Sequence, residues 1–546
     1  MKRIIALCIC AVLCACFILC SSFAEEDELA MMFRYPLNDR GEATVNDVTF
    51  TDPLESDGQH LVFYEIFVGS FSDSNGDGIG DLRGIIDRMD YLNDGDPKSG
   101  LSLGVEGIWL TPVFLSPSYH KYDVTDYYTI DPQFGNEDDF RELAGLCHER
   151  GIRLILDLPI NHTGRQNRWF KNFLNAHLMQ NPNNIWYDFY VWQTDDQPRP
   201  AGRHFARASG QNLLYEANFS DDMPELNFDN PRVYETVLDI ARHWLELGAD
   251  GFRFDAAKYL YLNDHARNLE FWQKYMNDLR SIKPDIYTVA EVWDSEGITD
   301  LYVPALNCFN FASSQTSGLI SETAHAGDVN RYAAYLEKTL DRITAIRPDA
   351  MNVPFIANHD TDRSAGYLTT ASGQMQMAAN LYLLAPGSPF IYYGEEIGLR
   401  GSRGGANTDA NRRLAMVWGD GDRIQDPEGT TYTKQTDYSV QKQKGRSDSP
   451  YTYYKRLIMI RRAYPEIARG TLKALNFKDT KAGGYICSLE GRSVIVLHNP
   501  TNATQKLDLS AFSGIVLCES VGAGKASLDG ASILLEGQTS AILRTE

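Results

Sequence analysis

Eight short apolar or β-branched runs recur along the chain, and helix-like stretches separate most of them. Residues 233–247 and 265–280 are two such stretches, with apolar residues at helical spacing. Strands that alternate with helices favour a parallel sheet, and eight such units favour a (β/α)8 TIM barrel in the α/β class. A doubly wound sheet could give the same count. The eight runs are residues 61–68, 107–114, 153–160, 251–256, 286–293, 307–312, 352–357 and 389–393.

One gap breaks this rhythm, between the third and the fourth run. Residues 163–225 show no barrel-like helix pattern and are rich in Asn, Trp, Tyr and Pro. Barrel enzymes build substrate clefts from insertions at the carboxyl ends of their strands. We therefore predict an insertion domain over 163–225, which divides a catalytic barrel into residues 58–162 and 226–465.

The segments before and after the predicted barrel lack its alternation of apolar runs and helix-like stretches. Residues 25–57 are acidic and turn-rich, without clear periodicity. The stretch 419–450 is polar and rich in Gly and Asp, which favours a loop, and a last barrel helix follows and stops at Pro465. Residues 466–546 hold short alternating runs between turn residues, which predicts a C-terminal all-β domain.

The N-terminus has the pattern of an export signal. Lys2 and Arg3 precede an uncharged apolar run over 4–19, and small residues lead up to Ala24, before an acidic stretch. We predict a signal peptide over these residues and a secreted or extracytoplasmic protein, with no transmembrane domain in the mature chain. A membrane anchor is the alternative, and residues 13–16 loosely resemble a lipobox, which would attach the protein to a lipid.

Cysteine and charge narrow the function further. Five of the nine cysteines lie in the leader, and the remaining four fit neither a disulfide scaffold nor a zinc site, although Cys487 and Cys518 could pair. The leader holds two basic residues and no acidic one, so cleavage after Ala24 would change the net charge from −22 to −24. Such a charge repels nucleic acid and anionic membranes and suits a neutral substrate. Oligomeric state is left open.

Polar and charged residues end several of the predicted strands, where barrel enzymes carry out their chemistry. One charged residue at the end of a buried strand is usually part of a structural ion pair, but several in succession favour a functional site. The four runs are Leu156-Asp157-Leu158-Pro159-Ile160-Asn161-His162, Gly251-Phe252-Arg253-Phe254-Asp255-Ala256-Ala257-Lys258-Tyr259, Ala290-Glu291-Val292-Trp293 and Phe355-Ile356-Ala357-Asn358-His359-Asp360.

These runs resemble, in order, the four principal conserved regions of the α-amylase family, glycoside hydrolase family 13. Residues 104–112 resemble its second-strand motif and 223–227 the short motif near the end of its insertion domain. The resemblance covers about residues 60 to 465. It is intermediate between the oligo-1,6-glucosidase-like and the neopullulanase-like branches.

The resemblance implies a retaining glycosidase. Asp255 matches the nucleophile and Glu291 the general acid/base, and Asp360 matches a third carboxylate that grips sugar hydroxyls. Arg253 would point to the same face of its strand as Asp255 and hold that carboxylate ionised. We expect neighbouring carboxylates to raise the pKa of Glu291.

The resemblance also implies substrate contacts around these carboxylates. Most match family residues that bind the sugar at the cleavage point or line the leaving-group side, and Asp157 is expected to support the site rather than react. The predicted substrate-binding residues are Tyr122, Asp157, His162, Arg253, Lys258, Tyr259 and His359.

A second motif predicts a structural calcium ion. Oxygen side chains alternate with glycines after the first predicted strand, as a hard cation requires. An EF-hand would need Glu where the chain has Gly84, so this loop is shorter and resembles the calcium loop of oligosaccharide-cleaving family members; an empty turn is the alternative. Asn161 matches a ligand of a different calcium site, whose partners the sequence does not identify. The predicted ligands are Asp73, Asn75, Asp77, Ile79 and Asp81.

The substrate is narrowed by short segments. Met223-Pro224-Glu225-Leu226-Asn227 and Ala256-Ala257-Lys258 differ from the segments usual in family members that cleave α-1,6 bonds, so the resemblance implies cleavage of α-1,4 bonds in starch and maltodextrins. An α-glucosidase, a cyclomaltodextrinase or neopullulanase, or a transglycosylase acting on short α-glucosides is the alternative within the family. A non-catalytic relative, such as a transporter heavy chain or a glucan-binding protein, would lack catalytic carboxylates, and all three are present here.

Overall fold

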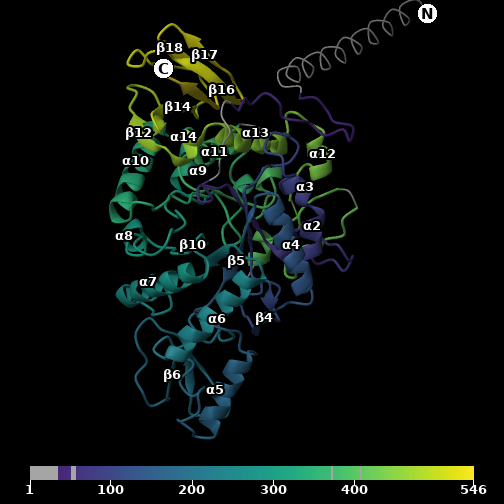
Figure 1. Ribbon diagram of the computed structural model, residues 1–546, viewed down its shortest axis with the longest axis vertical. Coiled ribbons are helices and arrows are strands. Elements are labelled where there is room, and N and C mark those ends of the chain that lie inside the picture. The colour runs from purple at the N-terminus through teal and green to yellow at the C-terminus, as the bar shows by residue number, and fades with distance from the viewer. Residues whose placement is uncertain are drawn as a thin grey trace, which may run out of the picture.

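The computed structural model describes residues 35–50, 57–369, 373–405, 408–419, 421–433 and 435–545. The predicted leader, residues 1–24, lies outside these residues. A barrel forms the body of the molecule, and the insertion after its third strand and the C-terminal sheet lie at opposite ends of it (Figure 1). Among the described residues, no helix is both long and apolar enough to cross a membrane.

Six parallel strands form the continuous part of the barrel. They are hydrogen-bonded in the order β10-β9-β5-β2-β1-β11. Barrel strands that follow one another along the chain therefore lie side by side, as in a (β/α)8 barrel. All of these strands are buried on both faces, which explains why they read as unbroken apolar runs. Their bounds are β1 Phe63–Ile66, β2 Gly107–Leu110, β5 Arg153–Leu158, β9 Gly251–Phe254, β10 Tyr287–Ala290 and β11 Phe390–Tyr392.

The remaining two predicted strands close the barrel through single bridges. The bridges are parallel and join Ala290 to Cys308, Phe309 to Val353, and Phe355 to Phe390. The sequence predicted full strands over 307–312 and 352–357, and that part of the prediction is wrong. Pro354 has no N–H to donate, so the ladder is interrupted there. The barrel prediction itself is confirmed.

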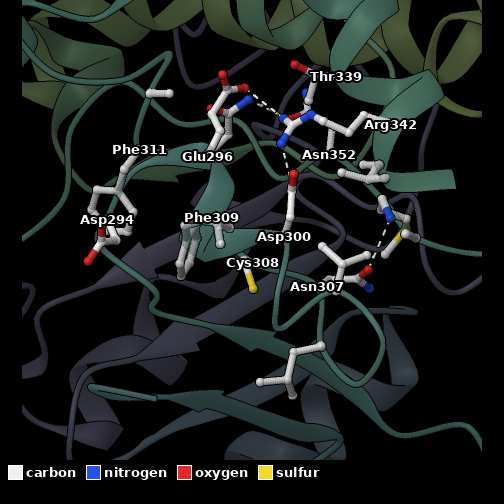
Figure 2. A pocket seen from close by; sticks show the side chains of 18 residues that line it. Asp294, Glu296, Asp300, Asn307, Cys308, Phe309, Phe311, Thr339, Arg342 and Asn352 are labelled. Atoms are coloured by element: carbon white, nitrogen blue, oxygen red, sulfur yellow. Dashed lines mark hydrogen bonds and ion pairs between the residues drawn. The ribbon is translucent and has the colours of Figure 1, made fainter. Parts of the chain in front are cut away.

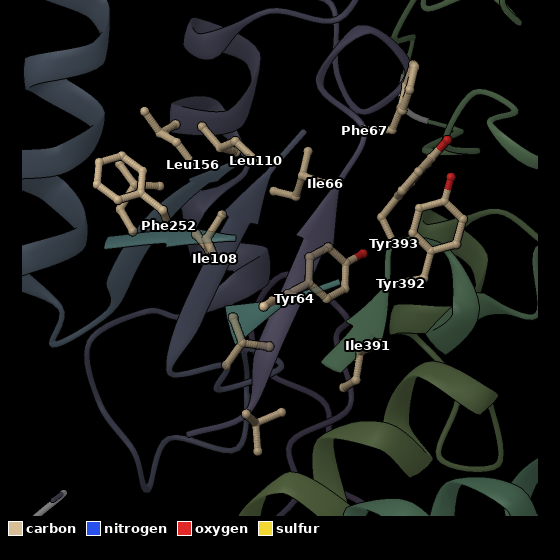
Figure 3. Close-up of a cluster of buried hydrophobic side chains, with 14 of the residues drawn as sticks. Tyr64, Ile66, Phe67, Ile108, Leu110, Leu156, Phe252, Ile391, Tyr392 and Tyr393 are labelled. Carbon is tan, nitrogen blue, oxygen red and sulfur yellow. The ribbon is translucent and has the colours of Figure 1, made fainter. Parts of the chain in front are cut away.

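Side chains alternate between the inside and the outside of the barrel. Phe63 belongs to a cluster of buried residues that fills the interior, together with Trp109 and Phe390. The next residue, Tyr64, belongs to the larger core between the sheet and the helices, part of which Figure 3 shows. This alternation places Glu65 in the interior row again, one step nearer the carboxyl ends of the strands.

Helices cover the outside of the barrel. Helix α6 is an example of how the sequence sets their ends: Asn230 caps its first turn, Pro231 opens it, and Gly248 ends it in the left-handed region. The α-helices of the barrel are α2 Leu82–Asp87, α3 Met89–Leu92, α4 Glu137–Glu149, α6 Pro231–Leu247, α7 His265–Ile282, α8 Glu296–Thr299, α9 Leu319–Ala324, α10 Val329–Ile346, α11 Gln374–Leu383, α12 Val440–Lys444, α13 Pro450–Ala463 and α14 Pro465–Arg469. Short 3-10 turns lie at Val68–Ser70, Ser364–Gly366, Glu395–Ile397 and Asp409–Arg412.

Three details differ from the sequence prediction. The predicted loop 419–450 contains α12, whose first turn is capped by Ser439. Pro465 ends α13 as predicted, but it also opens α14, because proline fits the first turn of a helix. The insertion contains α5, Arg168–Leu178, whose one buried face the sequence analysis did not detect.

The insertion is small and mostly irregular. Besides α5 it has a three-stranded sheet in the order β6-β8-β7, and a hairpin, β3-β4, precedes it in the chain. The strand bounds are β3 Phe114–Leu115, β4 Asp126–Ile130, β6 Trp192–Gln193, β7 Phe205–Arg207 and β8 Leu214–Glu216.

The C-terminal part forms two antiparallel sheets, in the orders β12-β13-β14-β19-β16 and β15-β18-β17. Cys487 on β13 and Cys518 on β16 are both free thiols, so the suggested disulfide does not form. Two strands separate them, and strands spaced about 4.8 Å apart put the pair beyond disulfide reach. The bounds are β12 Thr471–Leu475, β13 Gly483–Leu489, β14 Arg492–Asn499, β15 Gln505–Asp508, β16 Val516–Gly522, β17 Ala526–Asp529, β18 Ser532–Leu535 and β19 Thr539–Arg544.

Candidate active site

Arg253 is the centre of a buried cluster of carboxylates at the carboxyl ends of the barrel strands. Its guanidinium lies 2.8 Å from Asp157 Oδ1, 2.5 Å from Asp255 Oδ1 and 3.0 Å from Glu291 Oε2. The three carboxylates come from or just after β5, β9 and β10, which are neighbours in the sheet. The barrel therefore brings together residues that are far apart in the sequence, as predicted.

Asp255 and Glu291 share one guanidinium, so their carboxyl groups lie side by side. Glu291 Oε2 also accepts a hydrogen bond of 3.0 Å from the backbone N–H of Ala256. Ala256 has a φ of 46°, a conformation that costs energy for a residue other than glycine. This strained turn directs its N–H toward Glu291. Glycoside cleavage with retention requires two carboxyl groups close together, one to attack the sugar and one to donate a proton.

Burial sets the protonation of this pair. It raises the pKa of Glu291 to about 7, and the charges of Asp255 and Asp360 add to the rise while Arg253 opposes it. The sequence analysis attributed this shift to neighbouring carboxylates, but desolvation is the larger cause. Burial also raises the pKa of Asp255, and Arg253 again opposes the rise. A buried carboxyl group with a pKa near neutrality can serve as a general acid.

Asp360 lies next to this pair and is held by two cations. Arg413 donates to Asp360 Oδ1 at 2.8 Å, and His359 Nε2 lies 3.1 Å from Asp360 Oδ2. Although burial opposes it, these cations hold the pKa of Asp360 far below its usual range, with His359 the largest contributor. Asp360 is thus a fixed negative charge beside the pair.

An open cavity of about 1380 Å³ lies over these carboxylates. Of the predicted site residues, Asp255, Glu291, Asp360, Tyr122, His162 and Tyr259 line it. Aromatic side chains from both the barrel and the insertion form part of the walls. The lining residues are Tyr119, His120, Tyr122, His162, Phe219, Ser220, Met223, Asp255, Ala256, Tyr259, Glu291, Trp293, Asp360, Asp409 and Arg413.

Four predicted substrate contacts lie elsewhere. Asp157, Arg253 and His359 are fully buried beneath the cavity, where they bond to the carboxylates and to Tyr122 rather than to the open space. Lys258 donates to Asp294 and to the carbonyl of Trp293, each at 2.7 Å. These four side chains, which the motifs predicted would contact a ligand, are therefore bound to other groups of the protein.

The sequence analysis missed several residues of the site. Glu65 forms an ion pair with His359, and a charge inside the apolar run Phe63–Ile66 was the signal that could have found it. Arg413 had no such signal, because it lies in an irregular segment far from the motifs. Phe219 and Trp293 line the cavity with 47% and 41% of their surfaces exposed, which is high for large apolar residues.

A second pocket, of about 490 Å³, lies between α8 and α10 on the outer wall of the barrel. Figure 2 shows Arg342 pointing to both Glu296 and Asp300 across it. Helix α8, which lines one side of the pocket, is a single turn of four residues. Arg342 pairs with Glu296 and Asp300, and Lys258 binds Asp294.

The predicted calcium loop wraps around its own side chains. Asp73 Oδ1 accepts from the N–H groups of Asn75 and Gly76, and Asp77 Oδ1 accepts from Ile79 N at 2.8 Å. Asp81 caps α2 through Gly84 N and also accepts from Ser74.

No three His, Cys, Asp or Glu side chains that could hold a metal together occur in the described part of the chain. A calcium ion in this loop would therefore need the side-chain amide oxygen of Asn75 and the main-chain oxygen of Ile79 as well as carboxylates. Asn161, the other candidate ligand, donates to Glu225 at 3.3 Å.

Comparison with known proteins agrees with this geometry. The family model described as "Alpha amylase, catalytic domain" matches residues 65–470. Alpha-amylase 3 of Dictyoglomus thermophilum is 35% identical over 449 residues, which cover 81% of this chain and 85% of the relative. A 4-alpha-glucanotransferase of Thermotoga neapolitana is 31% identical over 456 residues, covering 81% and 96%.

Among solved structures, Eubacterium rectale Amy13B superposes with a TM-score of 0.84 at 32% identity, covering 91% of this chain and 97% of that one. The family match spans the insertion and the barrel from Glu65 onward, and it includes every strand end that carries a carboxylate of the cluster. The chain is a glycoside hydrolase of the α-amylase family, glycoside hydrolase family 13.

Proposed function

We propose that the protein hydrolyses α-1,4-glucosidic bonds in starch and maltodextrins with retention of configuration. The observation that carries the proposal is the shared guanidinium of Arg253, which sets Asp255 and Glu291 side by side with different electrostatic surroundings. The third carboxylate, Asp360, faces the same cavity. Within the family this trio separates an enzyme from a non-catalytic relative.

In the proposed first step, Asp255 attacks the anomeric carbon while Glu291 gives its proton to the departing glycosidic oxygen. A glucosyl ester on Asp255 results, and the rest of the glucan leaves with its new hydroxyl. In the second step Glu291, now a carboxylate, takes a proton from water. The water oxygen bonds to the anomeric carbon and Asp255 departs as a carboxylate. Asp360 favours the positive charge that develops on the sugar.

Exposed aromatic rings support a glucan as the substrate. Phe219 comes from the insertion and packs near Tyr259, with ring centroids 5.1 Å apart. Trp293 comes from the barrel and stacks on Phe311 at 4.8 Å. Sugar rings bind on such faces, and two of them in one cavity suit more than one glucose unit.

The product pattern tests this proposal. We expect maltoheptaose to be cut to short α-configured maltooligosaccharides, with pullulan and cyclodextrin cut more slowly. Cyclodextrin cut faster than maltoheptaose would instead indicate a cyclomaltodextrinase. Longer products than the substrate would indicate a transglycosylase, the activity that the name of the Thermotoga neapolitana relative describes.

We also propose that the loop from Asp73 to Asp81 binds a structural calcium ion. Oxygen donors from Asp73, Asn75 and Asp77, with the carbonyl of Ile79 and with Asp81, are of the kind that calcium takes. An ion bound only by the folded protein adds about 2.7 kcal/mol at a hundred times its dissociation constant. Chelator should therefore lower Tm without lowering the initial rate at low temperature, and Asp77→Ala should remove that response. Loss of the rate without loss of Tm would contradict a structural role.

Export is the last part of the proposal. The charged, apolar and small-residue pattern that ends at Ala24 supports a secreted or extracytoplasmic location, with lipid attachment as the alternative. N-terminal sequencing of the protein from its native host tests it: a mature chain that begins at Glu25 is expected. A blocked, lipid-modified cysteine would favour the anchored form.

A further inference from the structure

Glu65 is a buried carboxylate that the proposed reaction does not use. It lies in β1, faces the barrel interior, and is 1% exposed. Its Oε1 lies 2.6 Å from His359 Nδ1 and also accepts from the backbone N–H of His359 at 3.3 Å. Burying a carboxylate costs free energy. The presence of Glu65 beside His359 therefore indicates a role other than packing.

The hydrogen bonds around His359 decide its protonation. On the far side of the ring, Nε2 lies 2.7 Å from the hydroxyl of Tyr122. That hydroxyl has one proton and donates it to Asp157 Oδ2 at 2.8 Å, so Nε2 must donate to the tyrosine oxygen. On the near side, Nδ1 must donate to the carboxylate of Glu65, which only accepts. Both ring nitrogens therefore donate, and only the imidazolium form can do that.

We infer that Glu65 is a positioning residue that keeps His359 in its doubly protonated, cationic form, so that the Nε2–H donor always faces Tyr122 and Asp360. This inference rests on the proposed glycosidase function, because Asp360 and Tyr122 line the cavity where that reaction takes place.

The charges around His359 support this role. Burial alone would lower the pKa of His359, but Asp360 and Glu65 outweigh it and raise the pKa to about 10. The other charged groups near the ring are Asp157, Arg413, which donates to the His359 carbonyl at 3.1 Å, and Arg253. Asp255 and Glu291 both interact with Asp360, and the Tyr392 hydroxyl interacts with Glu65.

The packing fixes the ring as well as its charge. Trp109 on β2 meets His359 edge-on, with ring centroids 5.6 Å apart, and Tyr122 stacks on its face at 5.5 Å. The guanidinium of Arg253 lies 5.2 Å from the Trp109 ring. A ring held on these sides cannot turn to exchange its partners, so loss of the Glu65 charge should change protonation rather than orientation.

Glu65→Gln separates charge from shape. The amide keeps an oxygen that accepts from Nδ1, but it no longer favours the cation, so His359 should lose its second proton as the pH rises. Above the new pKa, the ratio of wild-type kcat to variant kcat should grow by up to about tenfold per pH unit, while at low pH it should approach one. The ratio cancels the ionisation of Glu291 that both proteins share.

Two variants act as controls. Glu396 is also fully buried, but it accepts from Tyr64 and Tyr91, so Glu396→Gln should give a ratio that does not vary with pH. In the background of His359→Gln, adding Glu65→Gln should cost no further activity, because Glu65 acts through His359. Tm, measured for every variant, reports any loss of folding. A flat or falling ratio for Glu65→Gln in a folded protein would overturn the inference.

A measurement without substrate keeps the inference separate from the proposed function. In protein labelled with ¹⁵N-histidine, the signal that disappears in His359→Gln belongs to His359. We expect imidazolium shifts from pH 5 to pH 9 in the wild type and a change to the neutral form within that range in Glu65→Gln. If His359 titrates alike in both proteins, the inference fails even when maltoheptaose is cleaved. If the shifts behave as expected and maltoheptaose is not cleaved, only the proposed substrate fails.

Discussion

Two clusters in this protein place one arginine between carboxylates, and they differ in burial. Arg253 and Asp157 are 1% and 0% exposed at the side chain, and Asp255 and Glu291 line the substrate cavity. Arg342, between Glu296 and Asp300, is 25% exposed on the outer wall. The ion-pair contacts are short in both clusters, and burial raises the pKa of Glu291 in the first cluster to about 7. Removal from water is what shifts the pKa of a carboxyl group in the Arg253 cluster, whereas solvent screens the ion pairs of the outer cluster.

The largest difference between the clusters should appear in the rate of reaction. Asp255→Asn and Glu291→Gln each remove a reacting group with almost no change of shape, and kcat on maltoheptaose should fall by roughly three orders of magnitude or more. Glu296→Gln is the matched change in the outer cluster and should leave kcat within about twofold. Equal losses in both clusters would show that the comparison is false.

The second difference should appear in stability. Arg253→Met leaves Asp157, Asp255 and Glu291 without their shared cation, and the free energy of unfolding should fall by about 3–5 kcal/mol. Denaturant unfolding measures it. Arg253→Lys restores the charge but not the fork-shaped contacts, so it should recover only part of the loss. If Arg253→Met lowered the free energy of unfolding by less than about 1 kcal/mol, the buried cluster would contribute no more to stability than the exposed one.

The third difference should appear in the pH dependence. Glu291 must be protonated for the first step, and its pKa is raised to about 7, so kcat/KM should decline as pH rises through that value. If kcat/KM instead declined near the usual pKa of glutamate, about 4.3, burial would not determine the pKa of Glu291. Asp300→Asn in the outer cluster should leave the pH of this decline unchanged.

The smallest effect should come from the outer arginine. Arg342→Met removes two ion pairs, with Glu296 and Asp300, that water and salt already screen, so the unfolding free energy should change by less than about 1 kcal/mol. The change should shrink further at high salt. A loss as large as that expected for Arg253→Met would show that exposure does not distinguish the clusters.

Much of the fold could be predicted because the barrel strands are short, apolar and regularly spaced. Asp255 and Glu291 could be placed because each directly follows a barrel strand, and Asp360 because it lies within a family motif. The lengths of two predicted strands, 307–312 and 352–357, were overestimated. In the second of them Pro354 has no N–H for the ladder, which apolar composition does not report.

The partners of the site were harder to predict. Arg413 contacts Asp360 from an irregular segment, and no local pattern marks such a contact. Lys258 looked available to substrate because its motif says nothing of Asp294, which binds it. Sequence patterns report which side chains reach the site; which of them are already paired is decided by packing between distant segments.

The central claim is that the Arg253 cluster performs a double displacement through Asp255, and trapping the intermediate tests it most directly. A 5-fluoro-α-glucosyl fluoride slows the second step, so the glucosyl ester should accumulate and peptide mass spectrometry should locate it. The account predicts one label, on Asp255, with α-configured products from the natural substrate. A label on another carboxylate, or β-configured products without any label, would contradict it.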